Sequence, residues 1–532
     1  MPTDCISYQA SGYFIPLMND YLDQKEHLKP FYNRFPSVEN FKQQIAEKHQ
    51  NYTQAHREVL VSVVNKQYTS IAASESTSQN IASLLDTNTF TITTGHQLNL
   101  FTGPLYFLYK IISTINLTKE LKEAYPDKNF VPIYWMATED HDFEEINYFN
   151  FKGKKFRWNH EASGPVGRLS TAGLELVFDV YKNELGLGEN ADTLKNWFEE
   201  AYCKHHNLTD ATRYLANQLF GNQGLVILDA DNVDLKRMFI PHIKNELVHQ
   251  LAHKEVTATA ECLSDYKIQV NPREINLFYM EDNLRERIIL QNGSYWVNNT
   301  NLKFTQEEIL SEAENQPQKF SPNVIMRPLY QEVILPNLCY IGGGGELAYW
   351  LELKSYFEAS KITFPVLLLR NSVVLATSKQ AQKADKLNLS WGDLFLKQSA
   401  LKNKITVQSS NLILDFSAQK QYLQAQFSAL RDMAKQTDAS FLGAVNAQET
   451  KQIKGLNNLE KRLLKAEKKR FEDQINRATS LQNELFPQQG LQERYANFSE
   501  FYLENGNQLI NKLLHTLQPL ENRFEVVVLE ND

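Results

Sequence analysis

The stretch Thr89–Lys110, "TFTITTGHQLNLFTGPLYFLYK", contains the pattern that decides the fold. Its first six residues are β-branched or aromatic, which predicts a short buried strand. Glycine turns follow at Gly95 and Gly103, and apolar residues at helical spacing then predict a helix over 104–125. The run Phe130–Ala137, "FVPIYWMA", predicts a second strand. Together these elements predict a β-α-β unit with parallel strands and a right-handed crossover.

Further strands alternate with helices along the chain. "GLVILDA" (Gly224–Ala230) predicts a buried strand, and Tyr340–Ala359 predicts a strand end, a glycine turn and a helix. "FPVLLLRNSVVLA" (Phe364–Ala376) predicts one or two core strands. The fold class expected is therefore α/β, with a Rossmann-like, doubly wound parallel sheet.

The rest of the chain predicts additions to this core. Inserted segments are expected at about 150–220 and 265–320; the first begins with a hairpin and the second contains antiparallel strands that turn at Asn292-Gly293. The core domain is expected to span 1–385 and a coiled-coil arm 386–487. A C-terminal segment, 488–532, is expected to hold one helix and a last strand that returns to the core.

The arm is expected from apolar residues that recur every seven positions. They form two runs, Phe416, Leu423 and Leu430, then Leu464, Phe471, Ala478 and Leu485, with a break over 437–448. This pattern predicts two long antiparallel helices. Two ordinary amphipathic helices packed on the core are the alternative.

Composition and charge exclude several classes of protein. The chain has 532 residues and a net charge of −8, which argues against general nucleic-acid binding. Its four cysteines lie far apart without a CxxC pair, so neither a disulfide framework nor a zinc site is expected. No signal peptide and no membrane span is expected, and a cytoplasmic location fits best.

The first candidate site lies where the strand from Thr89 ends. Ligands of open α/β sheets bind at the carboxyl ends of strands, and free N–H groups at a helix start attract anions. The alternative is that the glycines serve tight turns and that His96 is a structural histidine. The candidate residues here are Gly95, His96, Gln97, Asn99, Gly103, Tyr106 and Lys110.

The second candidate site is the acidic stretch "WMATEDHDFEEINYF" (Trp135–Phe149). So dense a cluster of carboxylates repels itself unless it is solvated, caps a helix or faces a cation. A helix cap is the alternative to a role in amine binding, Mg²⁺ binding or proton transfer. The candidate residues are Trp135, Glu139, Asp140, His141 and Asp142.

The third candidate site is "MRPLYQEVILPNLCYIGGGGELAYW" (Met326–Trp350). Its four glycines match neither a P-loop nor a dinucleotide fingerprint, but they let a ligand approach the backbone. A flexible turn is the alternative. Arg327 is expected to bind an anion with Glu332 as its partner, and Arg370-Asn371 interrupts an apolar strand pair. Further candidates are Gly343, Gly344, Glu346 and Tyr349.

These motifs, with "FPVLLLRNS", resemble the BshC family, the cysteine ligases of bacillithiol biosynthesis. The resemblance covers most of the chain. It implies a Rossmann-type core with inserted segments, and a C-terminal coiled coil that forms a homodimer. It also implies the last step of the pathway, which joins L-cysteine to glucosaminyl-malate through an amide.

Amide formation from a carboxylic acid needs an activated acyl group, so ATP, with Mg²⁺, is the expected cofactor. The catalytic residues expected are His96, Asp140, His141 and Asp142; Arg327 or Lys110 is expected to face the malate carboxylates. Two alternatives remain open. One is a class I synthetase-like nucleotidyltransferase acting on another substrate, and the other is a non-catalytic coiled-coil scaffold with a ligand-binding α/β domain.

Overall fold

The computed structural model describes residues 3–530, which form two compact units. Of these residues, the larger unit comprises 5–375 and 491–530. The smaller unit comprises 376–490 with residues 3 and 4. The last part of the chain therefore belongs to the same unit as the first two thirds.

The larger unit is built on a five-stranded parallel sheet with the strand order β13-β12-β2-β3-β6. The β-α-β prediction is confirmed, because β2 and β3 pair in parallel along their whole length and α6 connects them. Sheet and connecting helix are β2 (Thr89–His96), α6 (Tyr106–Ala124), β3 (Asn129–Met136), β6 (Val226–Asp229), β12 (Asn337–Gly342) and β13 (Val366–Leu369). The Rossmann-like fold class is thus confirmed.

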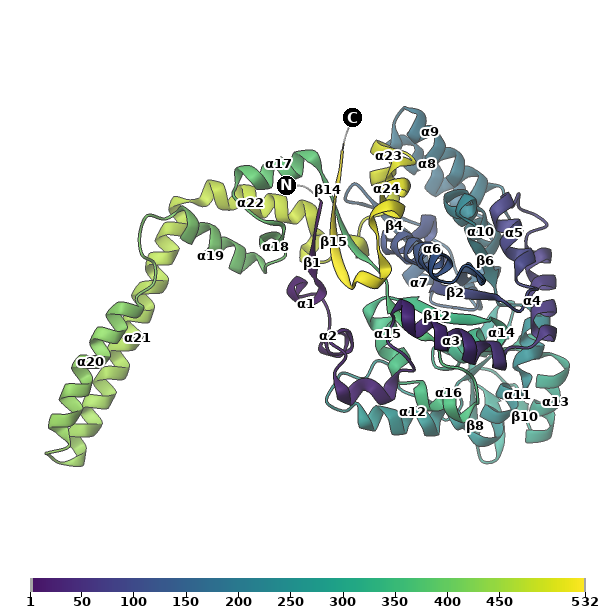
Figure 1. Cartoon of the computed structure of the whole chain (residues 1–532), viewed down its shortest axis with the longest axis horizontal. Coiled ribbons are helices and arrows are strands. Elements are labelled where there is room, and N and C mark those ends of the chain that lie inside the picture. The colour runs from purple at the N-terminus through teal and green to yellow at the C-terminus, as the bar shows by residue number, and fades with distance from the viewer. Residues whose placement is uncertain (1–2, 531–532) are drawn as a thin grey trace. The chain divides into compact units, whose positions relative to one another are not determined.

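Helices cover the sheet, and every residue of β2, β12 and β13 is buried. α6 packs on β2 and β3, α3 (Val38–Asn51) on β12, and α4 (Gln54–Gln67) and α5 (Glu75–Ser83) on β6 (Figure 1). The apolar core between them includes Phe41, Phe90, Ile92, Leu117, Leu338 and Val366. Burial on both faces explains why these strands read as continuous apolar runs.

The other helices of the larger unit surround this core. They are α1 (Tyr8–Ser11), α2 (Pro16–Leu22), α7 (Phe143–Ile146), α8 (Leu174–Leu185), α9 (Glu189–Phe198), α10 (Leu208–Phe220), α11 (Val233–His249), α12 (Leu251–Cys262), α13 (Gln306–Asn315), α14 (Met326–Ile334), α15 (Gly344–Leu351) and α16 (Lys354–Ala359). α15 follows β12 directly and packs on β13.

The second inserted segment contains a separate antiparallel sheet with the order β10-β9-β8-β7-β11. Its strands are β7 (Leu277–Glu281), β8 (Leu284–Gln291), β9 (Ser294–Val297), β10 (Lys303–Phe304) and β11 (Phe320–Pro322). The predicted turn is confirmed, since Asn292 and Gly293 both have positive φ between β8 and β9. The predicted hairpin near residue 150 is also confirmed, as β4 (Tyr148–Phe151) and β5 (Lys154–Arg157).

The C-terminal segment differs from the single helix expected. Two helices form, α23 (Phe498–Asn505) and α24 (Gln508–Thr516). The chain breaks at Gly506, where φ is +54° and a β-carbon would lie 2.7 Å from Oδ1 of Asn190. The last strand, β15 (Arg523–Leu529), lies between β1 (Asp4–Ser7) and β14 (Ser372–Thr377).

The smaller unit contains the coiled coil. α20 (Ser417–Ala434) and α21 (Ala439–Arg470) lie side by side as a helical hairpin (Figure 1). Its seam consists of Leu423, Phe427, Ala434, Leu442 and Val445. The predicted break over 437–448 is wrong in length, because Asp438 caps α21 by accepting hydrogen bonds from the two N–H groups that follow Ala439, and the helix begins there.

The second apolar run also spans more than one helix. α21 ends at Arg470, and α22 (Glu472–Leu485) follows after Phe471. Ala478 and Leu485 are buried on α22, which packs on α17 (Ser378–Lys386) and α19 (Gln398–Ser409). The short helix α18 (Trp391–Leu394) completes the unit. Among residues 3–530, no helix is long and apolar enough to cross a bilayer.

Candidate functional site

A cavity of about 870 Å³ lies at the carboxyl ends of the parallel strands. Residues from the ends of β2, β3 and β12 line the cavity. Residues from β7, β8 and the segment after β11, which belong to the inserted sheet, line it as well. Arg494, from the C-terminal segment, also lines it. The sheet order reverses between β2 and β12, so the cavity lies at the switch point where open α/β sheets bind ligands.

Most of the residues expected to form the site converge on this cavity. Those that line it are Gly95, His96, Gln97, Tyr106, Lys110, Trp135, Glu139, Asp140, His141, Arg327, Gly343, Glu346, Tyr349 and Arg370. The candidates outside its lining are Asn99, Gly103, Asp142, Glu332, Gly344 and Asn371. Three motifs that are far apart in sequence therefore contribute to one site.

The cavity lining carries far more positive than negative side chains. Its carboxylates are Glu139, Asp140 and Glu346, and its cations are Lys110, Arg273, Arg285, Arg287, Arg327, Arg370 and Arg494. Only two of these cations, Lys110 and Arg370, have an ion pair within residues 3–530. An excess of unpaired guanidinium groups in a concave site favours an anionic ligand.

An ion pair spans the switch point. Nζ of Lys110, on α6, lies 2.6 Å from Oε2 of Glu346, on α15, and also donates to the carbonyl of Gly95 at 2.7 Å. Both helices begin just after neighbouring strands, so the pair ties together the two loops that diverge at the switch point. Burial lowers the pKa of Lys110, while Glu346 opposes that shift.

Glu346 accepts two more hydrogen bonds. The Gly343 N–H donates to it at 2.8 Å and the Tyr340 hydroxyl at 2.9 Å. Burial favours the neutral acid, but Lys110 and these donors hold the pKa of Glu346 below its ordinary value. Glu346 is therefore ionised at neutral pH and acts as a fixed acceptor, which makes it a poor candidate for a proton-transfer group.

His96 is a neutral imidazole in this structure. Burial, reinforced by Lys110, lowers its pKa to about 3. Its ring contacts Tyr106 edge-on at 5.3 Å between centroids, and its Nε2 has no hydrogen-bond partner among the described residues. A histidine of this kind can exchange hydrogen bonds with a bound ligand without carrying charge.

Arg327 lies among aromatic rings near the end of β2. Its guanidinium carbon is 5.7 Å from the ring centroid of Trp135, 5.6 Å from Tyr340 and 6.0 Å from Trp350. Nη1 donates to Gln331 at 3.1 Å, whereas Nη2 is buried without a partner in the described part of the chain. The aromatic faces stabilise the cation but supply no acceptor for that N–H group.

Arg370 follows β13 and is held by the C-terminal segment. Nη2 lies 2.7 Å from Glu493, and Nη1 donates to the Asn371 carbonyl and to the Ser372 hydroxyl. Arg370 is 3% exposed and Glu493 1%. Its charge is thus balanced inside the protein, although Nε remains without a partner among residues 3–530.

The acidic stretch after β3 separates into groups with different partners. Asp140 accepts hydrogen bonds from Gln97 at 2.8 Å and from the His141 N–H at 2.7 Å. Nδ1 of His141 lies 2.5 Å from Nη1 of Arg285, which holds the two side chains together across the cavity. Burial, and then Arg285, lowers the pKa of His141, so the ring is neutral at pH 7 and accepts from Arg285. Asp142 is exposed and lies at the start of α7 without forming a side-chain cap.

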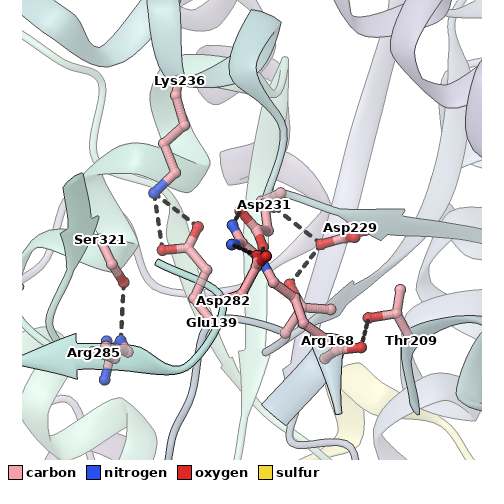
Figure 2. A network of polar contacts seen from close by, with 12 residues as sticks. Glu139, Arg168, Thr209, Asp229, Asp231, Lys236, Asp282, Arg285 and Ser321 are labelled. Carbon is pink, nitrogen blue, oxygen red and sulfur yellow. Dashed lines mark hydrogen bonds and ion pairs between the residues drawn. The ribbon is translucent and has the colours of Figure 1, made fainter. Parts of the chain in front are cut away.

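Glu139 belongs to a polar network next to the cavity (Figure 2). Its carboxylate lies 2.8 Å from Nζ of Lys236, which is fully buried and also donates to the Phe320 carbonyl. Figure 2 shows the ammonium group of Lys236 directed at both oxygens of Glu139. Glu139 therefore has its counter-ion already and is not free to bind the amine of a substrate.

The same network connects the core to the inserted sheet. Arg168 donates to both oxygens of Asp231, at 2.8 and 2.9 Å, and to Asp282 at 2.8 Å (Figure 2). Asp231 follows β6, and Asp282 lies in the turn between β7 and β8. Beside them, Asp229 accepts from Thr138 at 2.5 Å. These contacts hold the inserted sheet against the cavity.

The candidates outside the cavity serve the surrounding structure. Glu332 is buried and pairs with Lys48 at 3.3 Å, not with Arg327 as expected. Asn371 bonds the Ser113 hydroxyl and the Gln518 carbonyl. A β-carbon on Gly344 would lie 3.3 Å from Met18, so this glycine allows close packing of α15.

Asn99 and Gly103 belong to a strained loop between β2 and α6. Phe101 and Thr102 have φ of +47° and +67°, which non-glycine residues rarely adopt. The Asn497 amide holds this loop by donating to the carbonyls of Phe101 and Gly103 at 2.8 and 2.6 Å. A β-carbon on Gly103 would lie 2.6 Å from that of Asn99. These residues shape the loop that carries Gln97 to the cavity.

Sequence reasoning did not single out the arginines contributed by the inserted sheet and the C-terminus. Arg285 and Arg287 alternate along β8, "LRERIILQ", and therefore extend from the same face of that strand. That spacing is a signal that the sequence contains. Arg273 lies in an irregular segment and Arg494 in a 3-10 helix of three residues, both too short in regular structure for a periodicity to mark them.

Comparisons with known proteins agree along the whole chain. A family model described as "Bacillithiol biosynthesis BshC, N-terminal Rossmann-like domain" matches residues 1–371. A second, "Bacillithiol biosynthesis BshC, C-terminal coiled-coil domain", matches residues 373–529. The two models divide the chain within β14.

Relatives named "Putative cysteine ligase BshC" match over nearly their full lengths. One from Flavobacterium johnsoniae is 65% identical over 99% of this chain and 100% of its own. One from Cytophaga hutchinsonii is 37% identical, covering 97% and 96%. One from Bacillus cereus is 27% identical, covering 96% and 97%. A crystal structure titled as a putative arginyl-tRNA synthetase from Campylobacter jejuni covers 79% of this chain and 92% of its own, with 10% identity and a TM-score of 0.21, which is too low for any argument.

Proposed function

This chain belongs to the BshC family of bacillithiol biosynthesis, and we propose that it joins L-cysteine to glucosaminyl-malate through an amide bond in the last step of that pathway. The family name supports a cysteine ligase. The choice of acceptor and the position in the pathway are the finer parts of this proposal.

The charge of the cavity is the observation that carries the proposal. Five arginines of its lining have no ion pair within residues 3–530: Arg273, Arg285, Arg287, Arg327 and Arg494. Glucosaminyl-malate carries two carboxylates and cysteine carries one. A site that must hold both substrates together needs several guanidinium groups free to pair with them.

The same surplus of cations fits ATP as the activating co-substrate. Arg273, Arg287 and Arg494 are exposed at the cavity and would hold its phosphates, while Gly343 and Gly345 admit close approach to the start of α15. ATP would convert a carboxylate oxygen of cysteine into a leaving group. No cluster of acidic, histidine or cysteine side chains suited to a metal is present among residues 3–530.

In the overall reaction a C–N bond forms between the cysteine carboxyl carbon and the glucosamine nitrogen. The carboxylate oxygen leaves with the phosphoryl or adenylyl group, and the amine releases its protons. Asp140 is 27% exposed in its side chain and faces the cavity, so we assign it to bind the amine. His96 and His141 are neutral and orient substrates by hydrogen bonding.

The proposal includes a homodimer formed through α20 and α21. Large apolar side chains remain exposed on this hairpin: Tyr422, Leu430, Met433, Phe441 and Leu459. Exposed apolar side chains of this size on one helical hairpin are typical of an association surface.

The test is direct. The purified protein is incubated with glucosaminyl-malate, L-cysteine and MgATP, and products are identified by mass spectrometry. Bacillithiol together with AMP indicates that an adenylyl group leaves, and bacillithiol with ADP indicates that a phosphoryl group leaves. Absence of bacillithiol, with the protein shown to be folded by circular dichroism, contradicts the proposal. The control omits ATP and is expected to give no product.

A further inference from the structure

We propose that Arg327 is the receptor for one carboxylate group, located at the wall of the cavity formed by the ends of β2 and β12. This wall, called the sheet wall here, consists of Gly95, Arg327, Tyr340, Gly343 and Glu346. The inference deepens the proposed function by giving one substrate carboxylate a binding residue.

The surroundings of Arg327 prepare it for a ligand. A β-carbon on Gly95 would lie 3.9 Å from its Nη1 and 3.3 Å from the Tyr340 hydroxyl. The lack of a side chain at Gly95 therefore leaves room beside the guanidinium group. Trp135 and Tyr340 flank it at 5.7 and 5.6 Å, and these rings exclude water without neutralising its charge.

Two other buried cations lie next to the sheet wall, and unlike Arg327 both have a carboxylate partner. Lys110 is balanced by Glu346 at 2.6 Å and Arg370 by Glu493 at 2.7 Å. None of the described carboxylates lies within ion-pair distance of Arg327, whose side-chain partners are the neutral amide of Gln331 and the hydroxyl of Tyr349. Its Nη2 has no acceptor. One negative group with two acceptor oxygens would balance the charge and satisfy the N–H.

A carboxylate meets this requirement better than a polyphosphate chain. It carries a single charge, and its two oxygens match the fork of a guanidinium group. A polyphosphate would bring several negative charges to a wall with one uncompensated cation. The three exposed arginines of the cavity are better placed to bind a polyphosphate, because together they supply several positive charges: Arg273, Arg287 and Arg494.

Two substrates of the proposed reaction can supply the carboxylate, namely cysteine and the malyl group. The experiment titrates the full-length protein with L-cysteine and with L-malate by calorimetry, and uses cysteamine, which lacks the carboxylate, as the matched ligand. Variants are Arg327→Met, Arg327→Lys and, as control, Arg237→Met, an exposed arginine on α11.

We expect Arg327→Met to weaken the binding of either L-cysteine or L-malate at least about 10-fold, because a charge-assisted hydrogen bond to the carboxylate is lost. Loss for cysteine alone identifies the amino-acid carboxylate, and loss for malate alone identifies the malyl group. Arg237→Met is expected to bind both as the native protein does. Arg327→Lys keeps the positive charge and is used if Arg327→Met does not fold. Its affinity for the same carboxylate is expected to fall several-fold, because lysine lacks the two parallel N–H groups of the guanidinium group.

Unchanged affinity for both carboxylates in folded Arg327→Met or in Arg327→Lys would overturn the inference. So would a native protein that binds neither carboxylate at millimolar concentration, or one that binds cysteamine as tightly as cysteine and does not bind malate. Failure of the proposed function is distinguishable: then no bacillithiol forms, yet the Arg327 variants still lose carboxylate binding.

Discussion

The ammonium group of Lys110 and the carboxylate of Glu346 lie 2.6 Å apart, although they belong to helices that follow different strands. The pair closes the switch point of the sheet and fixes Gly343 and Tyr340 at the cavity. The Lys110–Glu346 ion pair therefore contributes both to the stability of the fold and to the shape of the site, because a ligand at the sheet wall is bound next to this pair.

We expect Glu346→Gln to lower the free energy of unfolding by about 3 kcal/mol, because Lys110 is left as an uncompensated buried charge. Since the pKa of Glu346 is held below its ordinary value, the stabilisation is present above about pH 4.3 and is lost as pH falls through the folded-state pKa. Urea unfolding at neutral and acid pH measures both effects. Glu504→Gln, at an exposed glutamate, is the control, and equal stability of the two variants would contradict this expectation.

Asp229 gives a pH dependence of the opposite sign. Burial, and then Asp231, raises its pKa to about 6. Its neutral form is favoured in the folded state, so the stabilisation is present below about pH 3.9 and is lost as pH rises through about 6. Asp229→Asn cannot ionise and keeps an oxygen for Thr138.

Relative to that of the native protein, the free energy of unfolding of Asp229→Asn is thus expected to increase by about 3 kcal/mol between acid and mildly alkaline pH. Chemical unfolding across that range checks it, with Asp265→Asn, at an exposed aspartate, as the comparison. A difference that does not change with pH would show that folding leaves the pKa of Asp229 unchanged.

Arg285 is expected to act on substrate affinity more than on turnover. It approaches His141 at 2.5 Å and bonds Ser321 at 3.0 Å, so its guanidinium group is held at the cavity. Arg285→Met should raise KM for glucosaminyl-malate about 10-fold or more with a smaller change in kcat, because it removes a cation that binds the ground state. Steady-state kinetics with Arg237→Met as control measure this. A fall in kcat at constant KM in Arg285→Met would contradict this expectation and indicate that Arg285 acts in the catalytic step.

The arm provides a test of the homodimer. Tyr422 is 74% exposed and Met433 62%, whereas Phe427 faces the seam within the hairpin. Replacing Tyr422 and Met433 together by glutamate should convert a dimer to a monomer without unfolding the hairpin, since charges are introduced only on the exposed surface. Light scattering measures the mass, and circular dichroism checks helicity. A dimer that persists would remove the arm from the interface.

The parts of the fold that the sequence predicts correctly are those set by residues close together in the chain. The apolar run of β2, the helical spacing of α6 and the Asn292-Gly293 pair each predict the element that forms there. The break at Gly506 lies next to Asn190, which is far away in sequence, so helical spacing alone does not reveal that contact. The spacing from Leu464 to Leu485 predicts one helix, because spacing alone does not reveal that the packing partners change between α21 and α22.

The site was predictable where glycines and a polar residue lie at strand ends. Gly95, His96 and Gly343 were marked in this way, and they line the cavity. The partners that decide the chemistry were not marked. Glu139 pairs with Lys236 and Arg370 with Glu493, and each pair joins residues separated by about a hundred positions, which only the folded chain brings together.

The segment after Leu491 has a consequence for the order in which the protein matures. Asn497 holds the strained loop at Phe101, Glu493 neutralises Arg370, and Arg494 completes the cavity. All three are synthesised after the arm, so a chain still emerging from the ribosome lacks these contacts however well its first 375 residues have folded. Completion of the cavity therefore requires that translation has passed Asn497, and a product that terminates before Glu493 would lack these contacts even with every strand of the parallel sheet in place.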